Sequence, residues 1–143
     1  MKNFHFNSET DFKISFLDHV AIRVTDLEAS AVWYEKVLGL TRYQPSKWEF
    51  PILLLSPNKT GIALFPEKTD DTKLELDSKN VKIDHFAFNV TMDNFEKAKK
   101  RYDCLGLKYD FQDHFYWHSI YTKDLDGHKV ELTTMVMDEK LVY

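Results

Sequence analysis

The sequence predicts an α+β fold made of two repeated βαβββ modules that together form a sheet-lined cleft. Residues 17–22 read LDHVAI and residues 83–88 read IDHFAF, and in both copies Val-Thr, a stretch with helical spacing and Leu-Gly-Leu follow. His19 and His85 occupy matching points of the two copies. A repeated supersecondary unit predicts that the copies pack together, so groups at equivalent points can meet at their interface.

Composition places the chain among ordinary globular proteins. Its 143 residues, 43% hydrophobic and 29% charged, suit one domain with a proper core and argue against disorder. A formal net charge of −4 gives no reason to expect nucleic acid or a membrane surface as a partner. No run reaches membrane-spanning length. The single cysteine, Cys104, excludes an internal disulfide framework, so we expect a cytoplasmic protein.

The first module is expected over residues 16–66, after an N-terminal extension (residues 1–15) that is an edge strand, a flap or a loose tail. Thr25 and Glu28 form the Ser/Thr-x-x-Glu capping-box pattern, which predicts that a helix begins there. Gly39 is expected to end this helix. Turn-prone segments separate the apolar runs around the helix and predict strands over residues 16–24, 40–44, 50–56 and 61–65.

The second module is expected over residues 82–134, after a charged surface linker at residues 67–81. Thr91 is the predicted cap of its helix. The tail, residues 135–143, either extends the last strand or covers a pocket. The same patterns as in the first module predict strands over residues 82–90, 107–111, 116–123 and 128–134.

Strand alternation gives the two histidines the same orientation. Successive side chains of a strand point to opposite faces of the sheet. Val20, Ile22 and Val24 form the apolar face expected to lie under the helix, which leaves His19 and Arg23 on the other face. In the second copy, Phe86, Phe88 and Val90 form the apolar face, and His85 and Asn89 share the opposite one. Both histidines are therefore expected to face the cleft.

The last predicted strand adds a carboxylate to this face. Val130 and Leu132 are its apolar side, so Glu131 projects the other way, where a bare buried carboxylate would be costly. Two imidazoles and one carboxylate with open positions form the facial triad of divalent-metal sites. The pattern predicts a metal site on His19, His85 and Glu131, with Glu131 also counted as a catalytic residue.

These residues resemble the vicinal oxygen chelate superfamily, which includes glyoxalase I, extradiol ring-cleaving dioxygenases, fosfomycin-resistance thiol transferases and bleomycin-binding proteins. The resemblance covers residues 16–134, and its most specific part is SIY followed by DLDGHKVEL at residues 119–132. It implies paired βαβββ modules, a homodimer, a small-molecule substrate, and a divalent ion held by His19, His85 and Glu131. The ion is iron, manganese, zinc or nickel, since the ligands alone do not choose.

Positions at which this sequence differs from the family's usual residues narrow the range of reactions expected of it. Leu64 is taken as the counterpart of Glu131 in the first module, so the fourth ligand of glyoxalase I is missing. Tyr121 matches a tyrosine of fosfomycin enzymes and ring-cleaving dioxygenases, whereas Ala21 replaces the hydroxyl or thiol usual in the former. Dioxygenases also use a cavity histidine as acid or base. Alternation points His118 away from the cleft, and His114 lies in a turn whose direction the sequence does not give.

For the other candidate residues, packing or pairing with neighbours explains the sequence pattern as well as a functional role does. Tyr121 is either a hydrogen-bond donor in the site or a packed sheet residue. Arg23 and Asn89 either bind substrate or pair with neighbours such as Glu49 and Glu67. Trp117 lines a pocket or packs in the core. His128 follows Gly127 in a turn and is expected to face solvent.

Two functions follow. The first is a metal-dependent enzyme that chelates vicinal oxygens of a small substrate, with lyase, isomerase, ring-cleaving dioxygenase or thiol transferase chemistry. The alternative is a metal-free small-molecule or drug-binding protein of the bleomycin-resistance type.

Overall fold

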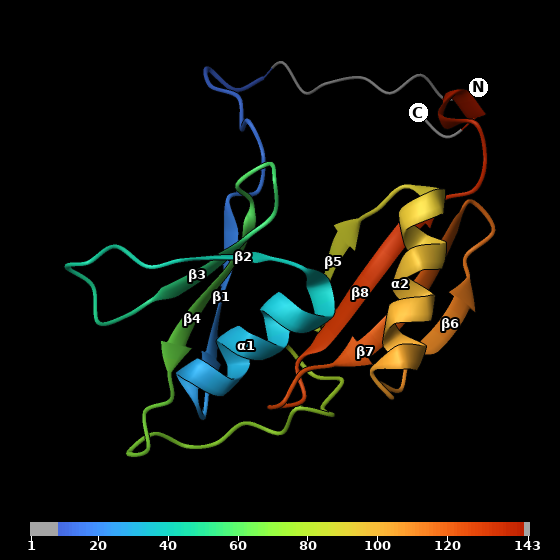
Figure 1. The fold of residues 1–143 in the computed structure, drawn as a ribbon. Coiled ribbons are helices and arrows are strands. Elements are labelled where there is room, and N and C mark those ends of the chain that lie inside the picture. Colours follow the sequence, from blue (N-terminus) through green and yellow to red (C-terminus); the bar gives the residue numbers. More distant parts are fainter. Residues whose placement is uncertain (1–8, 142–143) are drawn as a thin grey trace.

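The computed structural model describes residues 9–141 and contains the predicted repeat (Figure 1). Residues 1–8, the first part of the predicted N-terminal extension, and residues 142–143 of the tail lie outside the described residues. The elements of the first module are β1 (His19–Val24), α1 (Leu27–Leu38), β2 (Thr41–Tyr43), β3 (Ile52–Leu55) and β4 (Gly61–Pro66). Those of the second module and the tail are β5 (Phe86–Asn89), α2 (Met92–Cys104), β6 (Asp110–Asp113), β7 (Trp117–Lys123), β8 (Lys129–Met135) and the short helix η1 (Glu139–Leu141).

Each module forms its own four-stranded sheet with the same topology. The strand orders are β1-β4-β3-β2 and β5-β8-β7-β6. In both sheets the first strand of the module runs parallel to its last strand, and the other neighbours are antiparallel. The predicted α+β fold of paired βαβββ modules is therefore confirmed. This topology places the strand that begins at His19, and the strand that begins directly after His85, beside the last strand of the same module.

The sequence predicts some, but not all, of the residues that begin and end the two helices. Thr91 caps α2 as predicted, with its hydroxyl accepting the Asn94 N–H. Gly39, at φ 65°, ends α1 as predicted. The prediction that Thr25 caps α1 is wrong, because Asp26 accepts the Ala29 N–H instead.

Some strands begin or end at other residues than predicted, and at β6 the reason is that the preceding backbone groups hydrogen-bond to the end of α2. Residues 105–107 complete the end of α2, with the Leu107 N–H bonded to the Tyr102 carbonyl, so β6 starts at Asp110 and not at 107. β5 is shorter than predicted, at four residues. The described part of the N-terminal extension, residues 9–15, is exposed and forms no strand. No helix within residues 9–141 is long and apolar enough to span a membrane.

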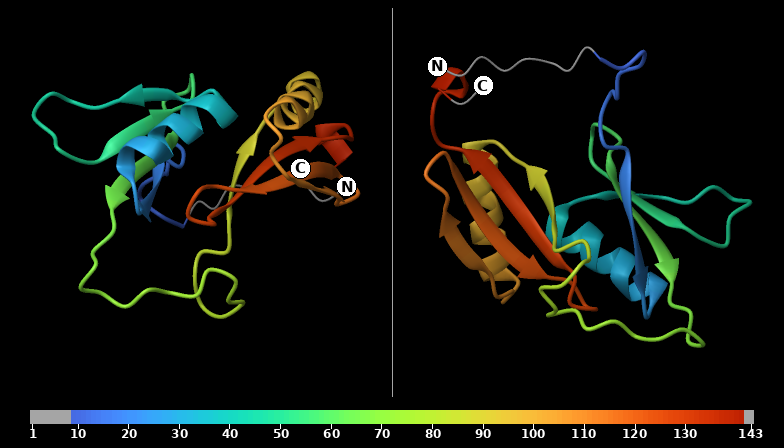
Figure 2. Two further views of the ribbon diagram at one scale, coloured as in Figure 1. Left: turned by 60° about the horizontal axis from the view of Figure 1, so that its bottom comes forward. Right: turned by 180° about the vertical axis from the view of Figure 1, so that it is seen from behind.

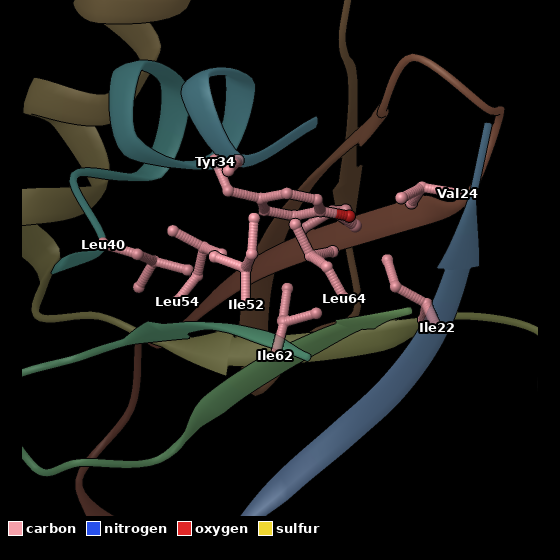
Figure 3. Packing of buried hydrophobic residues seen from close by; sticks show 10 residues of the cluster. Ile22, Val24, Tyr34, Leu40, Ile52, Leu54, Ile62 and Leu64 are labelled. Carbon is pink, nitrogen blue, oxygen red and sulfur yellow. The ribbon is translucent and has the colours of Figure 1, made fainter. Parts of the chain in front are cut away.

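The core is shared between the modules. Tyr34 of α1 is fully buried and lies over Ile22, Val24 and Leu64 of the first sheet (Figure 3). Val130 of β8 belongs to the same cluster, and α1 lies between the two sheets (Figures 1 and 2). The apolar faces of both sheets are thus directed toward the helices, and their opposite faces point away from the shared core.

A turn of the second module also anchors α1. The Tyr34 hydroxyl donates a buried 2.7 Å hydrogen bond to Asp124 in the β7–β8 turn. In the same turn Asp126 accepts hydrogen bonds from the N–H and the hydroxyl of Thr25. Thr25 is therefore engaged by the other module, which explains why it does not cap its own helix.

Candidate metal centre

His85 and Glu131 meet on the face of the second sheet that carries no helix. β5 and β8 are parallel neighbours, and Ala87 lies opposite Glu131 in the register. This pairing places the His85 ring, just before β5, with its Nε2 atom 2.9 Å from Glu131 Oε2. The Glu131 side chain is 9% exposed and that of His85 35%. The pair is open to a ligand from one side.

An aspartate directly before each histidine holds its ring. Asp18 lies 2.7 Å from His19 Nδ1, and Asp84 lies 2.7 Å from His85 Nδ1. Because a carboxylate only accepts hydrogen bonds, each of these contacts is satisfied by a proton on Nδ1. The Nε2 atom of His85 faces a second carboxylate, that of Glu131, so this contact needs a proton or a cation between the two atoms. Metal-ligating histidines in proteins are oriented in this way by a second carboxylate. The arrangement occurs once in each module.

His19 lies on the open face of the first sheet. Its backbone position is fixed from β4, since Thr60 donates its hydroxyl to the Asp18 carbonyl at 2.9 Å and Gly61 donates its N–H to the same carbonyl. Within residues 9–141 of a single chain, no group of three or more His, Cys, Asp or Glu side chains lies close enough to hold a metal ion. The structure therefore brings His85 and Glu131 together and leaves His19 apart from them.

Tyr121 lies beside Glu131, in agreement with the predicted phase. The two residues are directly opposite in the β7–β8 register, and the Tyr121 hydroxyl is close enough to the Glu131 carboxylate for its charge to act on the phenol. Burial raises the pKa of Tyr121, and the negative charge of Glu131 raises it further. The phenol is therefore protonated at neutral pH and acts as a hydrogen-bond donor.

His114 joins this group, a position that strand alternation could not supply. It follows β6, and its Nε2 atom lies 2.9 Å from the Tyr121 hydroxyl. The ring of His118, in contrast, packs on Phe111 at 5.1 Å between centroids, with Nε2 3.7 Å from Asp113. The prediction that His118 points away from Tyr121 is consistent with these contacts.

The three candidate substrate residues lie on the open faces but not at one point. Arg23 is exposed and donates to the Pro66 carbonyl at 2.8 Å, with its guanidinium 5.8 Å from the centre of the Phe65 ring. Asn89 is exposed and lies opposite Thr133, two residues beyond Glu131. Trp117 is partly buried and has the same strand phase as Tyr121.

Two expectations about individual residues are wrong. The counterpart of Glu131 in the first module is Ala63, since Ala63 lies opposite Ala21 as Glu131 lies opposite Ala87, whereas Leu64 is buried in the core. The conclusion that this position carries no ligand is unchanged. His128 does not simply face solvent, because its Nδ1 lies 2.9 Å from the buried Asp124 carboxylate. This hydrogen bond raises the pKa of His128 although burial opposes it.

A cavity of about 390 Å³ lies between β1 and β5, beneath the linker. His85 lines it, but His19 and Glu131 do not. Two of its lysines face acidic partners, Lys123 with Asp77 at 3.1 Å and Lys129 with Asp84 at 3.7 Å. The cavity is therefore distinct from a three-ligand site.

Comparisons with known proteins agree with this architecture. The chain is 28% identical to the glutathione transferase FosA of Serratia marcescens over 81% of its length and 78% of that protein. It is 31% identical to the metallothiol transferase FosB of Bacillus licheniformis over 92% of its length and 82% of that protein.

Solved structures share the fold. A glyoxalase/dioxygenase from Nostoc punctiforme matches with a TM-score of 0.75 at 18% identity, covering 94% of this chain and all of that one. The fosfomycin resistance protein FosX from Listeria monocytogenes matches with a TM-score of 0.68 at 21% identity, covering 92% of this chain and all of that one. A family model also matches residues 16–132. The chain therefore belongs to the Glyoxalase/Bleomycin resistance protein/Dioxygenase superfamily.

Proposed function

We propose that this protein is a metal-dependent enzyme whose divalent ion is held by His85 and Glu131 of one protomer and His19 of its partner. The observation that supports it best is the 2.9 Å approach of His85 Nε2 to Glu131 on an open sheet face. The matched orientation of both histidines by a preceding aspartate supports it further. The metal-free binding protein of the bleomycin-resistance type is the alternative that the tests below separate.

The donor atoms suit a divalent ion. Glu131 is largely buried, and a carboxylate removed from water needs a positive partner. Two neutral imidazoles and one carboxylate with further positions open are a recognised set for iron, and manganese, zinc and nickel also accept them. Asp18 and Asp84 would act as outer partners that hold the rings in place.

A homodimer would complete the site. Within one chain the ligand-bearing faces point away from the shared core, and both carry exposed residues that the sequence predicts to line a cleft, such as His19, Arg23 and Asn89. Large apolar side chains next to the histidines are also exposed: Leu17 at 71% and Ile83 at 74%. Packing the first sheet of one protomer on the second sheet of its partner would cover both faces. It would form two equivalent sites per dimer.

Thiol transfer to a small electrophile is the chemistry that the relatives support, since FosA and FosB are named as thiol-using transferases. A bound divalent ion supplies positive charge that polarises a substrate oxygen. Tyr121 lies beside the proposed ligand Glu131, and Arg23, Asn89 and Trp117 contact the rest of the substrate. Ala21 offers no hydroxyl to the substrate, which distinguishes this site from typical fosfomycin enzymes.

Metal content is the first test. Protein purified without chelator or nickel resin is expected to hold one divalent ion per chain, and His85→Ala is expected to lose it while remaining folded. Native protein without stoichiometric metal, and unchanged by His85→Ala, would leave the metal-free binding protein as the better explanation.

A mixing experiment tests whether the site spans two chains. His19→Ala and Glu131→Ala are each expected to bind no metal alone. In a mixed dimer of the two variants, one site loses both ligands and the other keeps all of its ligands. Random mixing should therefore restore roughly a quarter of the wild-type metal content. A site formed within one chain predicts no restoration at all.

The chemistry is tested with glutathione or cysteine and the epoxide fosfomycin as probes. In thiol transfer the S–H and epoxide C–O bonds break, an S–C bond forms, and the proton ends on the released oxygen. Mass spectrometry should detect an adduct equal to the sum of both reactants, dependent on metal. Metal-loaded protein that forms no adduct with any thiol would contradict the transferase assignment and leave the metal site intact.

A further inference from the structure

A line of neighbouring polar groups leads from Glu131 to the protein surface. Tyr121 lies directly opposite Glu131 in the β7–β8 register, and His114 hydrogen-bonds to Tyr121 with 2.9 Å between Nε2 and the hydroxyl oxygen. Glu131 is buried, Tyr121 is partly buried and His114 is exposed. The histidine thus reaches the carboxylate only through the phenol.

The chemistry of the groups fixes the direction of this line. An ionised carboxylate can only accept, so a proton shared between Tyr121 and Glu131 must come from the phenol. The phenol oxygen is then free to accept from His114 Nε2, in the tautomer that carries its proton there. In this arrangement Tyr121 orients the Glu131 carboxylate, whose Oε2 atom lies 2.9 Å from His85 Nε2, the other proposed ligand of the same chain.

The hairpin between β6 and β7 holds His114 in place. Its backbone N–H donates to the Trp117 carbonyl at 2.8 Å, and its carbonyl accepts from Tyr116 at 2.9 Å. Phe115, at the tip, has a φ of 72°, and its N–H bonds to Asp113 at 2.8 Å. These bonds fix the backbone at His114, and the 2.9 Å contact of Nε2 with the Tyr121 hydroxyl orients the ring. The imidazole is therefore positioned before any metal binds.

We propose that His114 is a positioning residue of the metal centre, which through the Tyr121 hydroxyl holds the Glu131 carboxylate in the orientation that binds the ion. The proposal rests on the proposed metal site. Outer hydrogen-bond partners of metal ligands commonly change metal affinity by about 10–100-fold when removed. Because His114 acts through one intermediate residue, the lower end of this range applies.

Binding of Co²⁺ alone tests the proposal without a substrate. Metal-free protein is titrated with Co²⁺, and visible absorption reports both the affinity and the geometry around the ion. His114→Phe is expected to raise the Kd about tenfold and to alter the absorption bands. His114→Gln, which keeps an N–H donor, is expected to recover most of the affinity, and a merely structural role predicts no such recovery.

His118→Phe is the matched control, because His118 lies in the same hairpin but contacts Phe111 and Asp113 instead of Tyr121. Its Co²⁺ affinity should equal that of the wild type. Tyr121→Phe should weaken binding at least as much as His114→Phe, and the double variant should show no further loss, since the two residues act in series.

Three results would overturn the proposal. They are wild-type affinity in a folded His114→Phe protein, equal losses in His114→Phe and His118→Phe, or additive losses in the double variant. If His114→Phe does not fold, His114→Leu removes the same donor with less bulk and decides the question. Wild-type protein that binds no Co²⁺ would refute the proposed metal site, and His114 positioning with it. Normal wild-type binding with an unaffected His114 variant refutes the positioning role alone.

Discussion

Two buried tyrosines, one in each helix, allow the contact between the modules to be measured. Tyr34 and Tyr102 are 0% and 1% exposed. The Tyr34 hydroxyl donates to Asp124 at 2.7 Å, whereas the Tyr102 hydroxyl has no hydrogen-bond partner among the described residues. Replacing each with phenylalanine removes one oxygen from similar surroundings. Any difference in stability therefore reports the bond from Tyr34 to Asp124.

The expected magnitude follows from the charge of the acceptor. A hydrogen bond to a charged group contributes about 1.5–3 kcal/mol, and Asp124 keeps its bonds from His128 in the variant, so Tyr34→Phe should cost about 2 kcal/mol. With an unfolding entropy of about 2.1 cal/mol/K per residue, this corresponds to a Tm lower by roughly 7 °C. Tyr102→Phe should be neutral or slightly stabilising, because a buried hydroxyl without a partner is itself unfavourable.

Urea unfolding followed by circular dichroism measures both variants and the wild type. Protein concentration must be the same throughout, since association changes apparent stability. Equal losses in Tyr34→Phe and Tyr102→Phe would refute the reasoning, because the two substitutions would then report only the removal of an oxygen. A loss in Tyr34→Phe that persists when Asp124 is replaced by Ala, which removes the acceptor, would locate the effect elsewhere.

Two further predictions concern the same turn and the strand beside His19. The hydrogen bond to Asp124 raises the pKa of His128, so its contribution to stability is complete below about pH 6.5 and is lost as pH rises through the folded-state value. Burial raises the pKa of Asp124, but the bonds from His128 and Tyr34 outweigh it and lower the net value, so this contribution is lost as pH falls below about 3.8. Urea midpoints across pH should therefore be highest between these limits, and His128→Gln should remove the decline on the alkaline side. Separately, a Cβ at Gly61 would lie 1.9 Å from the Leu54 carbonyl oxygen, so Gly61→Ala should cost more than about 3 kcal/mol, measured as a lower urea midpoint or loss of folded protein.

The sequence predicts the repeat well because its two signals, strand alternation and a glycine that ends a helix, depend only on neighbouring residues. Alternation in 19–24 and 129–135 places His19 and Glu131 on the correct faces, and Gly39 ends its helix through its own backbone freedom. The identity of the helix cap was missed because Thr25 and Asp26 are both good caps. The choice between them depends on Asp126, which is 101 positions away from Thr25.

The rest of the site depends on register and turn geometry, which a single sequence does not contain. Ala63 and Leu64 are both apolar, so only the pairing of β1 with β4 shows which of them corresponds to Glu131. His114 lies in a hairpin turn, where the period-two rule that places strand side chains does not apply. His128 is predicted to face solvent because it follows Gly127 in a turn, and the sequence does not show that this turn buries the Asp124 carboxylate beside it.

The placement of α1 between the sheets has a consequence for how the chain folds. Tyr34 belongs to a buried cluster that contains strand residues of the first module and also Val130 of the second. The Arg101 guanidinium of α2 donates to the carbonyl of Lys36 near the end of α1. A repeat whose copies shared no core could unfold one copy at a time. In this protein the first module would expose one side of α1 if the second module unfolded. We therefore expect the two copies to fold and unfold as one cooperative unit, although the sequence reads as two.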